Sequence, residues 1–139
     1  SSGNDLTLIA SDQLTSSYGA NISLTGNLNL TAGPGGIQTI GNIDIGSNTL
    51  TSNSGGSAIY VGDVTAGNLS LTTTETGSII QSTKFKGGAL NLTTNNGNVE
   101  VTATTGDLTI ASVNLGTGSA TIEATSGTIN DSTNDSTII

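Results

Sequence analysis

A short unit recurs along the chain and restricts its fold more than any other feature. The unit is a glycine, an Asn or Asp, and two aliphatic residues separated by one other residue. It occurs without deviation at Gly26–Leu30, Gly41–Ile45, Gly67–Leu71, Gly97–Val101 and Gly106–Ile110. Relaxed copies begin at Gly3, Gly19, Gly88 and Gly118. Nine copies in 139 residues are typical of a repeat protein.

Each copy of the unit predicts a turn followed by a strand. Glycine allows a positive φ at low steric cost, and we expect the Asn or Asp after it to bond its own backbone around the corner. The aliphatic pair alternates with period two, which predicts one buried and one exposed face. The residue between the two aliphatics is polar in every copy, as the exposed face requires. These residues are Thr7, Ser23, Asn29, Asp44, Ser70, Asn91, Glu100, Thr109 and Thr121.

The spacing of the predicted strands favours a solenoid. Glycine interrupts the chain about every ten residues, and Thr, Ser and Asn are mediocre helix formers, so we expect almost no helix. Similar strands return after 21, 26, 21, 18 and 21 residues, at Ile22, Ile43, Leu69, Leu90, Leu108 and Ile129. Leu6 and Leu28 fit another phase. We therefore predict an all-β fold, a parallel β-helix (β-solenoid) with coils of about 20 residues stacked about 4.8 Å apart.

A coil of this length also has room for further strands between the primary ones. The candidates are the apolar segments 37–40, 59–61, 79–80 and 99–101. The units at Gly97 and Gly106 would then form successive sides of one coil. Columns of Leu, Ile, Val and Ala would fill the interior, and Leu69 should stack on Leu90. Large rings fit poorly in such a column, and the chain has only three aromatic residues.

The composition excludes several functional classes. Charged residues make up 9% of the chain, against roughly 25% in a typical domain. The net charge of −8 with two Lys argues against nucleic-acid binding and against attraction to anionic membranes. The chain has no His or Cys, so it offers no Ser–His or Cys–His pair and no ordinary zinc site. We expect no enzyme activity, no cofactor and no metal site.

Two other functions would each depend on a particular set of residues. Glu75, Glu100 and Glu123 lie about one coil apart and could line one edge, as a carbohydrate-active β-helix would need. Threonine-rich solenoids can bind ice through a flat, uncharged array. We expect no such array, because the outward residues mix Asp44 and Glu100 with the threonines.

The segment Lys84–Lys86 is a candidate recognition loop. Lys84, Phe85 and Lys86 include both positive charges and the only Phe of the chain, and they interrupt the strand rhythm. We expect them on a protruding loop, where recognition residues are common. The competing interpretation is a solvated loop whose Phe folds back on the coil.

The run Gly67–Ser112 resembles the repeat region of filamentous-haemagglutinin-like exoproteins, large adhesins secreted by the two-partner route in Gram-negative bacteria. The resemblance is clearest from Gly67 to Asp131 and weaker from Gly19 to Gly67, and it rests on the rhythm of the motif. It implies a right-handed parallel β-helix, export through an outer-membrane partner, and service in an adhesive fibre. The secretion domain of this family carries Asn-Pro signals, whereas the only Pro here is Pro34.

These observations lead to one functional expectation. Residues 1–139 are expected to be a single β-helix segment excised from a longer repeat-built chain, serving as a structural and adhesive rod at the cell surface or in a secreted protein. The expected partners are a host or bacterial surface receptor or glycan and, during export, the outer-membrane transporter. Neither nucleic-acid binding nor membrane insertion is expected. The alternatives are a carbohydrate-binding or carbohydrate-active β-helix protein and another surface fibre, such as a phage tail protein.

Overall fold

The chain folds as a stack of β-strands in two sheets. The computed structural model describes residues 3–17, 19–39, 41–56 and 58–131, and these contain strands but no helix. Sheet A contains β1 (Leu6–Ile9), β4 (Leu28–Ala32), β7 (Thr49–Ser54), β9 (Asn68–Thr76), β11 (Ala89–Asn95), β13 (Leu108–Asn114) and β15 (Ile129–Asp131). Sheet B contains β2 (Gln13–Thr15), β3 (Ile22–Ser23), β5 (Gly36–Thr39), β6 (Ile43–Asp44), β8 (Ile59–Thr65), β10 (Ile80–Lys86), β12 (Val99–Thr105) and β14 (Ala120–Ala124).

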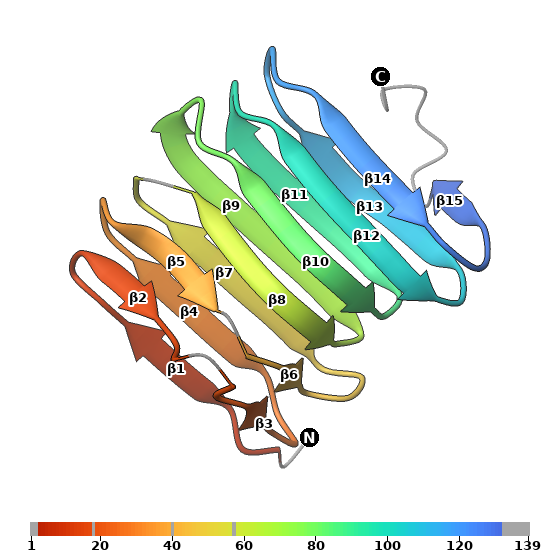
Figure 1. Ribbon diagram of the computed structural model, residues 1–139, viewed down its shortest axis with the longest axis horizontal. Helices are drawn as coiled ribbons and strands as arrows, with labels where there is room; N and C mark the ends of the chain where they lie inside the picture. Colours follow the sequence, from red (N-terminus) through yellow and green to blue (C-terminus); the bar gives the residue numbers. More distant parts are fainter. Residues whose placement is uncertain (1–2, 18, 40, 57, 132–139) are drawn as a thin grey trace.

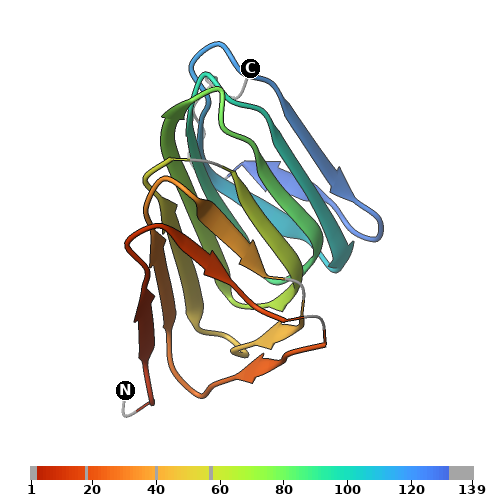
Figure 2. The ribbon, with the colours of Figure 1, turned by 60° about the vertical axis from the view of Figure 1, so that its left-hand side comes forward.

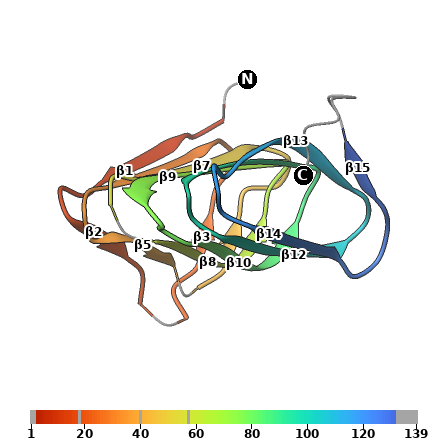
Figure 3. The ribbon, with the colours of Figure 1, turned by 90° about the horizontal axis from the view of Figure 1, so that it is seen from above.

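The chain alternates between the two sheets, so that each coil contributes one side to sheet A and one to sheet B (Figure 1). Every pairing between the described strands is parallel, and β5 and β6 pair with successive parts of β8. The two sheets face each other across the interior (Figure 3), and the coils follow one another along the stack (Figure 2). The prediction of an all-β parallel solenoid is confirmed.

Aliphatic columns run along the interior of the stack. In sheet A, five leucines pair in register with steps of 22, 22, 19 and 21 residues: Leu6, Leu28, Leu50, Leu69 and Leu90. The predicted stacking of Leu69 on Leu90 is confirmed, and both side chains are fully buried. In sheet B, the corresponding column is formed by Leu14, Ile37, Ile59, Ile80 and Val99. This second column confirms the strands predicted between the primary ones, except that Ile40 of the segment 37–40 lies outside the described residues.

The predicted series of primary strands is wrong at two steps, because Ile43 and Leu69 lie in different sheets and Leu90 pairs with Ile110 instead of Leu108. Ile22 and Ile43 pair with each other in sheet B, whereas Leu6 and Leu28 belong to the leucine column of sheet A. The same unit begins strands on both sides of a coil, so its spacing alone does not tell one sheet from the other. Within one coil the prediction holds, because the unit at Gly97 leads into β12 of sheet B and the unit at Gly106 into β13 of sheet A.

In three copies of the unit the Asn or Asp bonds to the next coil, which corrects the expectation of a bond to its own backbone. The Asn27 side-chain oxygen accepts from the Thr49 N–H at 3.0 Å, and Asn98 accepts from the Ser119 N–H at 3.0 Å. Asp107 accepts from the Thr128 N–H at 2.9 Å. Each such oxygen satisfies a backbone donor one coil along, so these corners are tied along the stack by side chains as well as by the ladders.

Glycine serves two different purposes at these corners. Gly106 has a φ of 73°, the left-handed conformation that the sequence predicts. Gly97 is required for another reason: a Cβ built on it would collide with the carbonyl oxygen of Ser78 in the preceding coil. Part of the glycine pattern therefore reflects close contact between coils.

Phe85 lies in the interior, which corrects the expectation of a protruding loop. Residues 84–86 end strand β10, and Phe85 is fully buried between Val64 and Ala103 on the neighbouring strands. Its ring packs against Gly87, where a Cβ would lie 2.6 Å from the ring carbon Cζ. A large ring fits in this layer because Ala103 and Gly87 leave room for it.

Candidate functional site

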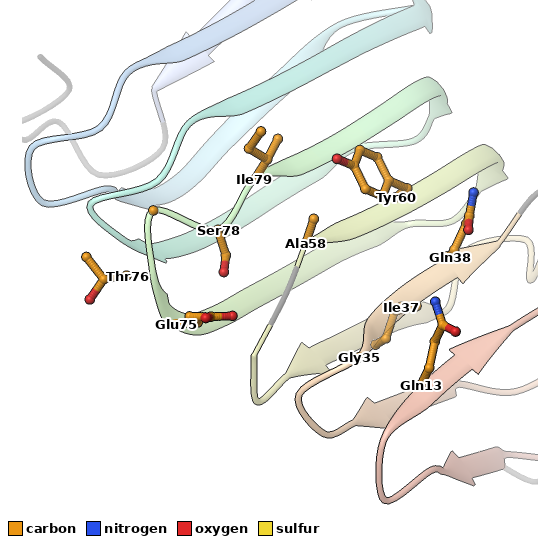
Figure 4. Close-up of a pocket in the computed structure, with 11 residues that line it drawn as sticks. Gln13, Gly35, Ile37, Gln38, Ala58, Tyr60, Glu75, Thr76, Ser78 and Ile79 are labelled. Atoms are coloured by element: carbon orange, nitrogen blue, oxygen red, sulfur yellow. The ribbon is translucent and has the colours of Figure 1, made fainter.

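The outer face of sheet B carries the larger of two hollows described here. It has a volume of about 500 Å³, and its floor comes from β2, β5 and β8 and from Ile79, which directly precedes β10. Figure 4 shows that residues of these strands and of the β9–β10 turn surround one hollow. We call it the Tyr60 groove. The residues that line it are Gln13, Gly35, Ile37, Gln38, Ala58, Tyr60, Glu75, Thr76, Gly77, Ser78 and Ile79.

The register of the parallel strands places large polar side chains side by side on this face. Gln38, Tyr60, Gln81 and Glu100 are partners on four successive strands, and they alternate with buried residues, so their side chains point outward. Tyr60 is 40% exposed, and the apolar Ile79 beside the groove is 41% exposed. Gln81 donates from Nε2 to Glu100 at 3.4 Å, so this ladder continues past the groove.

One wall of the groove exists because a single turn is two residues longer than its neighbour. Ser54 pairs with Thr73, and Ile59 pairs with Ile80, so the chain needs five residues for this step in one coil and seven in the next. The extra length carries Glu75, Thr76 and Gly77 to the side of the hollow. Strands of sheet B in successive coils thus define the floor, and the longer turn after β9 of sheet A defines the wall.

Hydrogen bonds hold the longer turn in place. The buried Ser78 hydroxyl donates to the Gly56 carbonyl at 2.7 Å, in the preceding coil. The Gly77 N–H donates to the Asn95 carbonyl at 2.8 Å, in the following coil, and the Ser78 N–H donates to the Glu75 carbonyl at 3.2 Å. Gly77 has a φ of 79°, a conformation that glycine adopts without strain. The wall is therefore fixed to both neighbouring coils.

The groove combines an aromatic surface with groups that accept and donate hydrogen bonds. Figure 4 shows the Tyr60 ring, the Gln13 and Gln38 amides and the Glu75 carboxylate around the same space. An amide offers both donors and an acceptor, and a carboxylate offers two acceptors. Exposed apolar or aromatic surface with a few converging polar groups is typical of a small-ligand site. The arrangement can bind a polar ligand that also has an apolar face.

The second hollow, of about 310 Å³, lies on the same sheet and contains both lysines; we call it the lysine groove. Lys84 and Lys86 are exposed on strand β10, so the residues predicted to form a recognition loop lie on a sheet face instead. Lys84 pairs in register with Asp63, and Lys86 pairs with Thr65, which in turn pairs with Asp44. Each lysine thus has an acidic residue within one or two strands. Their role in recognition stays a prediction, whereas Phe85 is a core residue.

The three glutamates do not line one edge, which corrects that expectation. Glu100 and Glu123 lie exposed on β12 and β14 of sheet B, whereas Glu75 lies near the end of β9 in sheet A. Their spacing was misleading because Glu100 pairs with Gln81, six residues after Glu75, so Glu75 does not occupy the equivalent position of the preceding coil. Among the described residues, no three His, Cys, Asp or Glu side chains form a group that could hold a metal ion.

The Tyr60 groove itself was not predicted from the sequence. A signal for it is present in the interval between the two interior columns, which is nine residues from Leu50 to Ile59 and eleven from Leu69 to Ile80. The difference between the two intervals can be recognised in the sequence only after the strands have been assigned to sheets.

Comparisons with protein-family models, with curated proteins and with solved structures found no match to the chain. Within the residues that the structure describes, no helix has the length and hydrophobicity needed to cross a membrane.

Proposed function

We propose that this chain is a structural and adhesive rod segment of a large secreted bacterial surface exoprotein. Two parallel sheets stacked coil on coil make a stiff spacer, because every coil is joined to the next along both faces. The observation that carries the adhesive part is the Tyr60 groove, a hollow with an exposed ring on the side of such a rod. The resemblance to two-partner-secreted adhesins supports the same function.

The proposed partners follow from this location. A receptor or glycan on a host or bacterial surface would bind at the side of the rod, and an outer-membrane transporter would act during export. Local contacts between successive coils allow folding to proceed coil by coil as the chain emerges. Folding outside the membrane would then oppose backward movement through the transporter.

Adhesion is tested directly with beads that carry the protein. We expect such beads to adhere to bacterial or epithelial cells more than beads that carry an inert acidic protein of similar size. Equal adherence of the two kinds of bead, over a panel of cell types, would contradict the adhesive function.

Export is tested by comparing two neighbouring substitutions in the full-length parent chain. Leu90→Asp places a charge in the leucine column, whereas Asn91→Asp places it on the outer face of the same strand. We expect the surface yield to fall for the first variant and to stay unchanged for the second. An unchanged yield for Leu90→Asp would argue against folding-driven export.

The carbohydrate-active alternative gains no support from the groove. Glycoside hydrolysis uses two carboxyl groups on either side of the scissile bond. Among the described residues that line the groove, Glu75 is the single carboxylate. Binding without cleavage is therefore the form of carbohydrate recognition that the groove favours.

A further inference from the structure

We infer that the Tyr60 groove binds a neutral glycan, with one sugar ring stacked on the Tyr60 side chain. This inference rests on the proposed adhesive function and names the class of ligand that the groove would hold. It depends on four properties of the groove, which are its exposed ring, its amides, its charge and its extent across the strands.

The exposed ring supplies the stacking surface. Tyr60 is 40% exposed on a strand whose neighbouring inward residues, Ile59 and Val61, are buried, so its backbone is held by the core. Ile79 adds further apolar surface at 41% exposure. A pyranose has an apolar face of C–H groups that packs on an aromatic ring, and burying such surface is favourable. Tyr60 and Ile79 line the same groove, so together they offer a ligand of this kind an apolar surface.

The polar groups around the ring match the edge of a sugar. Gln13 and Gln38 lie on adjacent strands, and Gln38 is the register partner of Tyr60. Their amides offer donors and acceptors together, which is what a pair of neighbouring hydroxyls requires. Glu75 on the wall offers acceptors to hydroxyl donors at the other side of the hollow. These groups can bind sugar hydroxyls without any charge on the ligand.

The charge of the site selects against acidic glycans. The chain has a net charge of −8, and Glu75 is the one charged residue in the described lining of the groove. Both lysines of the chain line the other hollow. A sulfated or sialylated sugar in the Tyr60 groove would therefore meet a carboxylate and no cation. A neutral sugar avoids this repulsion.

The extent of the groove favours a glycan chain over a single sugar. The lining residues extend across four neighbouring strand positions, from Gln13 on β2 through β5 and β8 to Ile79, which directly precedes β10. Strands lie about 4.8 Å apart, so the floor extends roughly 14 Å along the stack. A floor of this length has room for more than one sugar ring, with Tyr60 between the two glutamines on one side and Ile79 on the other.

The test is binding of the purified chain to neutral oligosaccharides of glucose, galactose, mannose and N-acetylglucosamine, with sulfated and sialylated oligosaccharides on the same array. Affinities for the best neutral probe are then measured by calorimetry for the wild type, Tyr60→Ala, Tyr60→Phe and Lys84→Ala. We expect Tyr60→Ala to weaken binding about tenfold, since it removes the stacking surface. Tyr60→Phe keeps the ring and Lys84→Ala lies in the other hollow, so both should bind nearly as the wild type does.

Three results would overturn the inference. They are no binding to any neutral probe, equal binding by Tyr60→Ala, and binding limited to acidic probes that Lys84→Ala abolishes. Thermal melting of each variant shows that a loss of binding is not a loss of folding. If wild-type beads adhere to cells while no neutral glycan binds, the inference fails and the adhesive function stands. If the beads do not adhere either, the proposed function fails as well.

Discussion

The outer faces of the two sheets differ sharply, although both sheets enclose the same interior. Sheet A presents two columns of paired residues that are uncharged, Thr7, Asn29, Thr51, Ser70 and Asn91, and Ile9, Thr31, Asn53, Thr72 and Thr93. Sheet B presents both lysines, Tyr60, Glu100 and both hollows. One face is thus uniform and the other is varied. The solenoid can keep one side constant while the other changes, since both depend on the same inward columns.

The separation of the two faces shows that Asp44 and Glu100 do not exclude a flat, uncharged ice-binding array on sheet A. The polar residues of the repeated unit form two sets, because Asp44 and Glu100 belong to sheet B and not to the column that contains Asn29 and Ser70. Sheet A is therefore uncharged along these columns. Its columns still mix amide and hydroxyl side chains and include Ile9, so they lack the regular threonine pattern of an ice-binding face.

If the two sheets differ only on their outer faces, equivalent substitutions of inward residues should lower the free energy of unfolding by the same amount on either sheet. Leu71→Ala in sheet A and Ile80→Ala in sheet B each remove a fully buried side chain. We expect each to lower the free energy of unfolding by about 2–5 kcal/mol, measured by urea denaturation. Neighbouring outward residues provide the control: Ser70→Ala and Gln81→Ala should each change the free energy of unfolding by less than about 0.5 kcal/mol. A large loss of stability on one sheet alone would mean that the two sheets do not contribute equally to the packed interior.

The corners that join the two faces provide the next test. Gly97→Ala introduces a Cβ that collides with the Ser78 carbonyl of the preceding coil. We expect a loss of about 1–3 kcal/mol in the free energy of unfolding, because the coils must separate locally. Gly55→Ala is the matched control: its Cβ would lie 3.4 Å from the nearest atom, an ordinary contact. If both variants were equally stable, close contact between coils would not explain Gly97.

A smaller loss of stability is expected when the side-chain hydrogen bonds at the same corner are removed. The Asn98 oxygen accepts from the Ser119 N–H at 3.0 Å and from the Ser119 hydroxyl at 3.2 Å. Asn98→Ala leaves the N–H without this partner, and we expect a loss of about 0.5–1.5 kcal/mol by the same denaturation measurement. Asn98→Asp keeps the acceptor and should retain most of the stability. Equal losses for both variants would show that the bond between coils contributes little.

The fold could be predicted from the sequence because its signal is local. Glycine, a short polar residue and an alternating aliphatic pair are enough to indicate a turn and a strand, and repetition indicates stacking. The assignment of strands to sheets could not be predicted, because Ile43 and Leu69 belong to copies of the same unit that form strands on different sides of the coil. Ser52 shows another limit: it lies buried in register with Leu30 and Leu71, where the pattern predicts an aliphatic residue.

The candidate site could not be predicted because it depends on register and on one turn length. Tyr60 and Gln38 are 22 residues apart, and only the pairing of β5 with β8 makes them neighbours. Lys84, Phe85 and Lys86 interrupted the apparent rhythm, yet the strand continues through them because a large ring can fill space beside Ala103 and Gly87. A break in a pattern of residue types is therefore not always a break in the strand.

The corner on the opposite side of the coil should respond to pH, unlike the Asn98 corner. The Thr128 N–H donates to the Asp107 carboxylate at 2.9 Å, and this bond, followed by one from the Thr128 side chain, lowers the pKa of Asp107 below its ordinary value of 3.8. A lowered folded-state pKa adds stability above the unfolded-state pKa, and this stability is lost as the pH falls through the folded-state pKa.

Asp107→Asn keeps an acceptor but does not titrate, so it isolates this contribution. We expect the wild-type Tm to fall more than that of Asp107→Asn between about pH 5 and about pH 3, by a small margin because Asp107 is exposed. Thr128→Val retains the backbone donor, which is the larger cause of the lowered pKa, and should keep most of the wild-type pH dependence. Identical Tm profiles for the wild type and Asp107→Asn would mean that the charge adds nothing to the bond. The two corners would then be equivalent, and the difference between the two sides of the molecule would be confined to their outer faces.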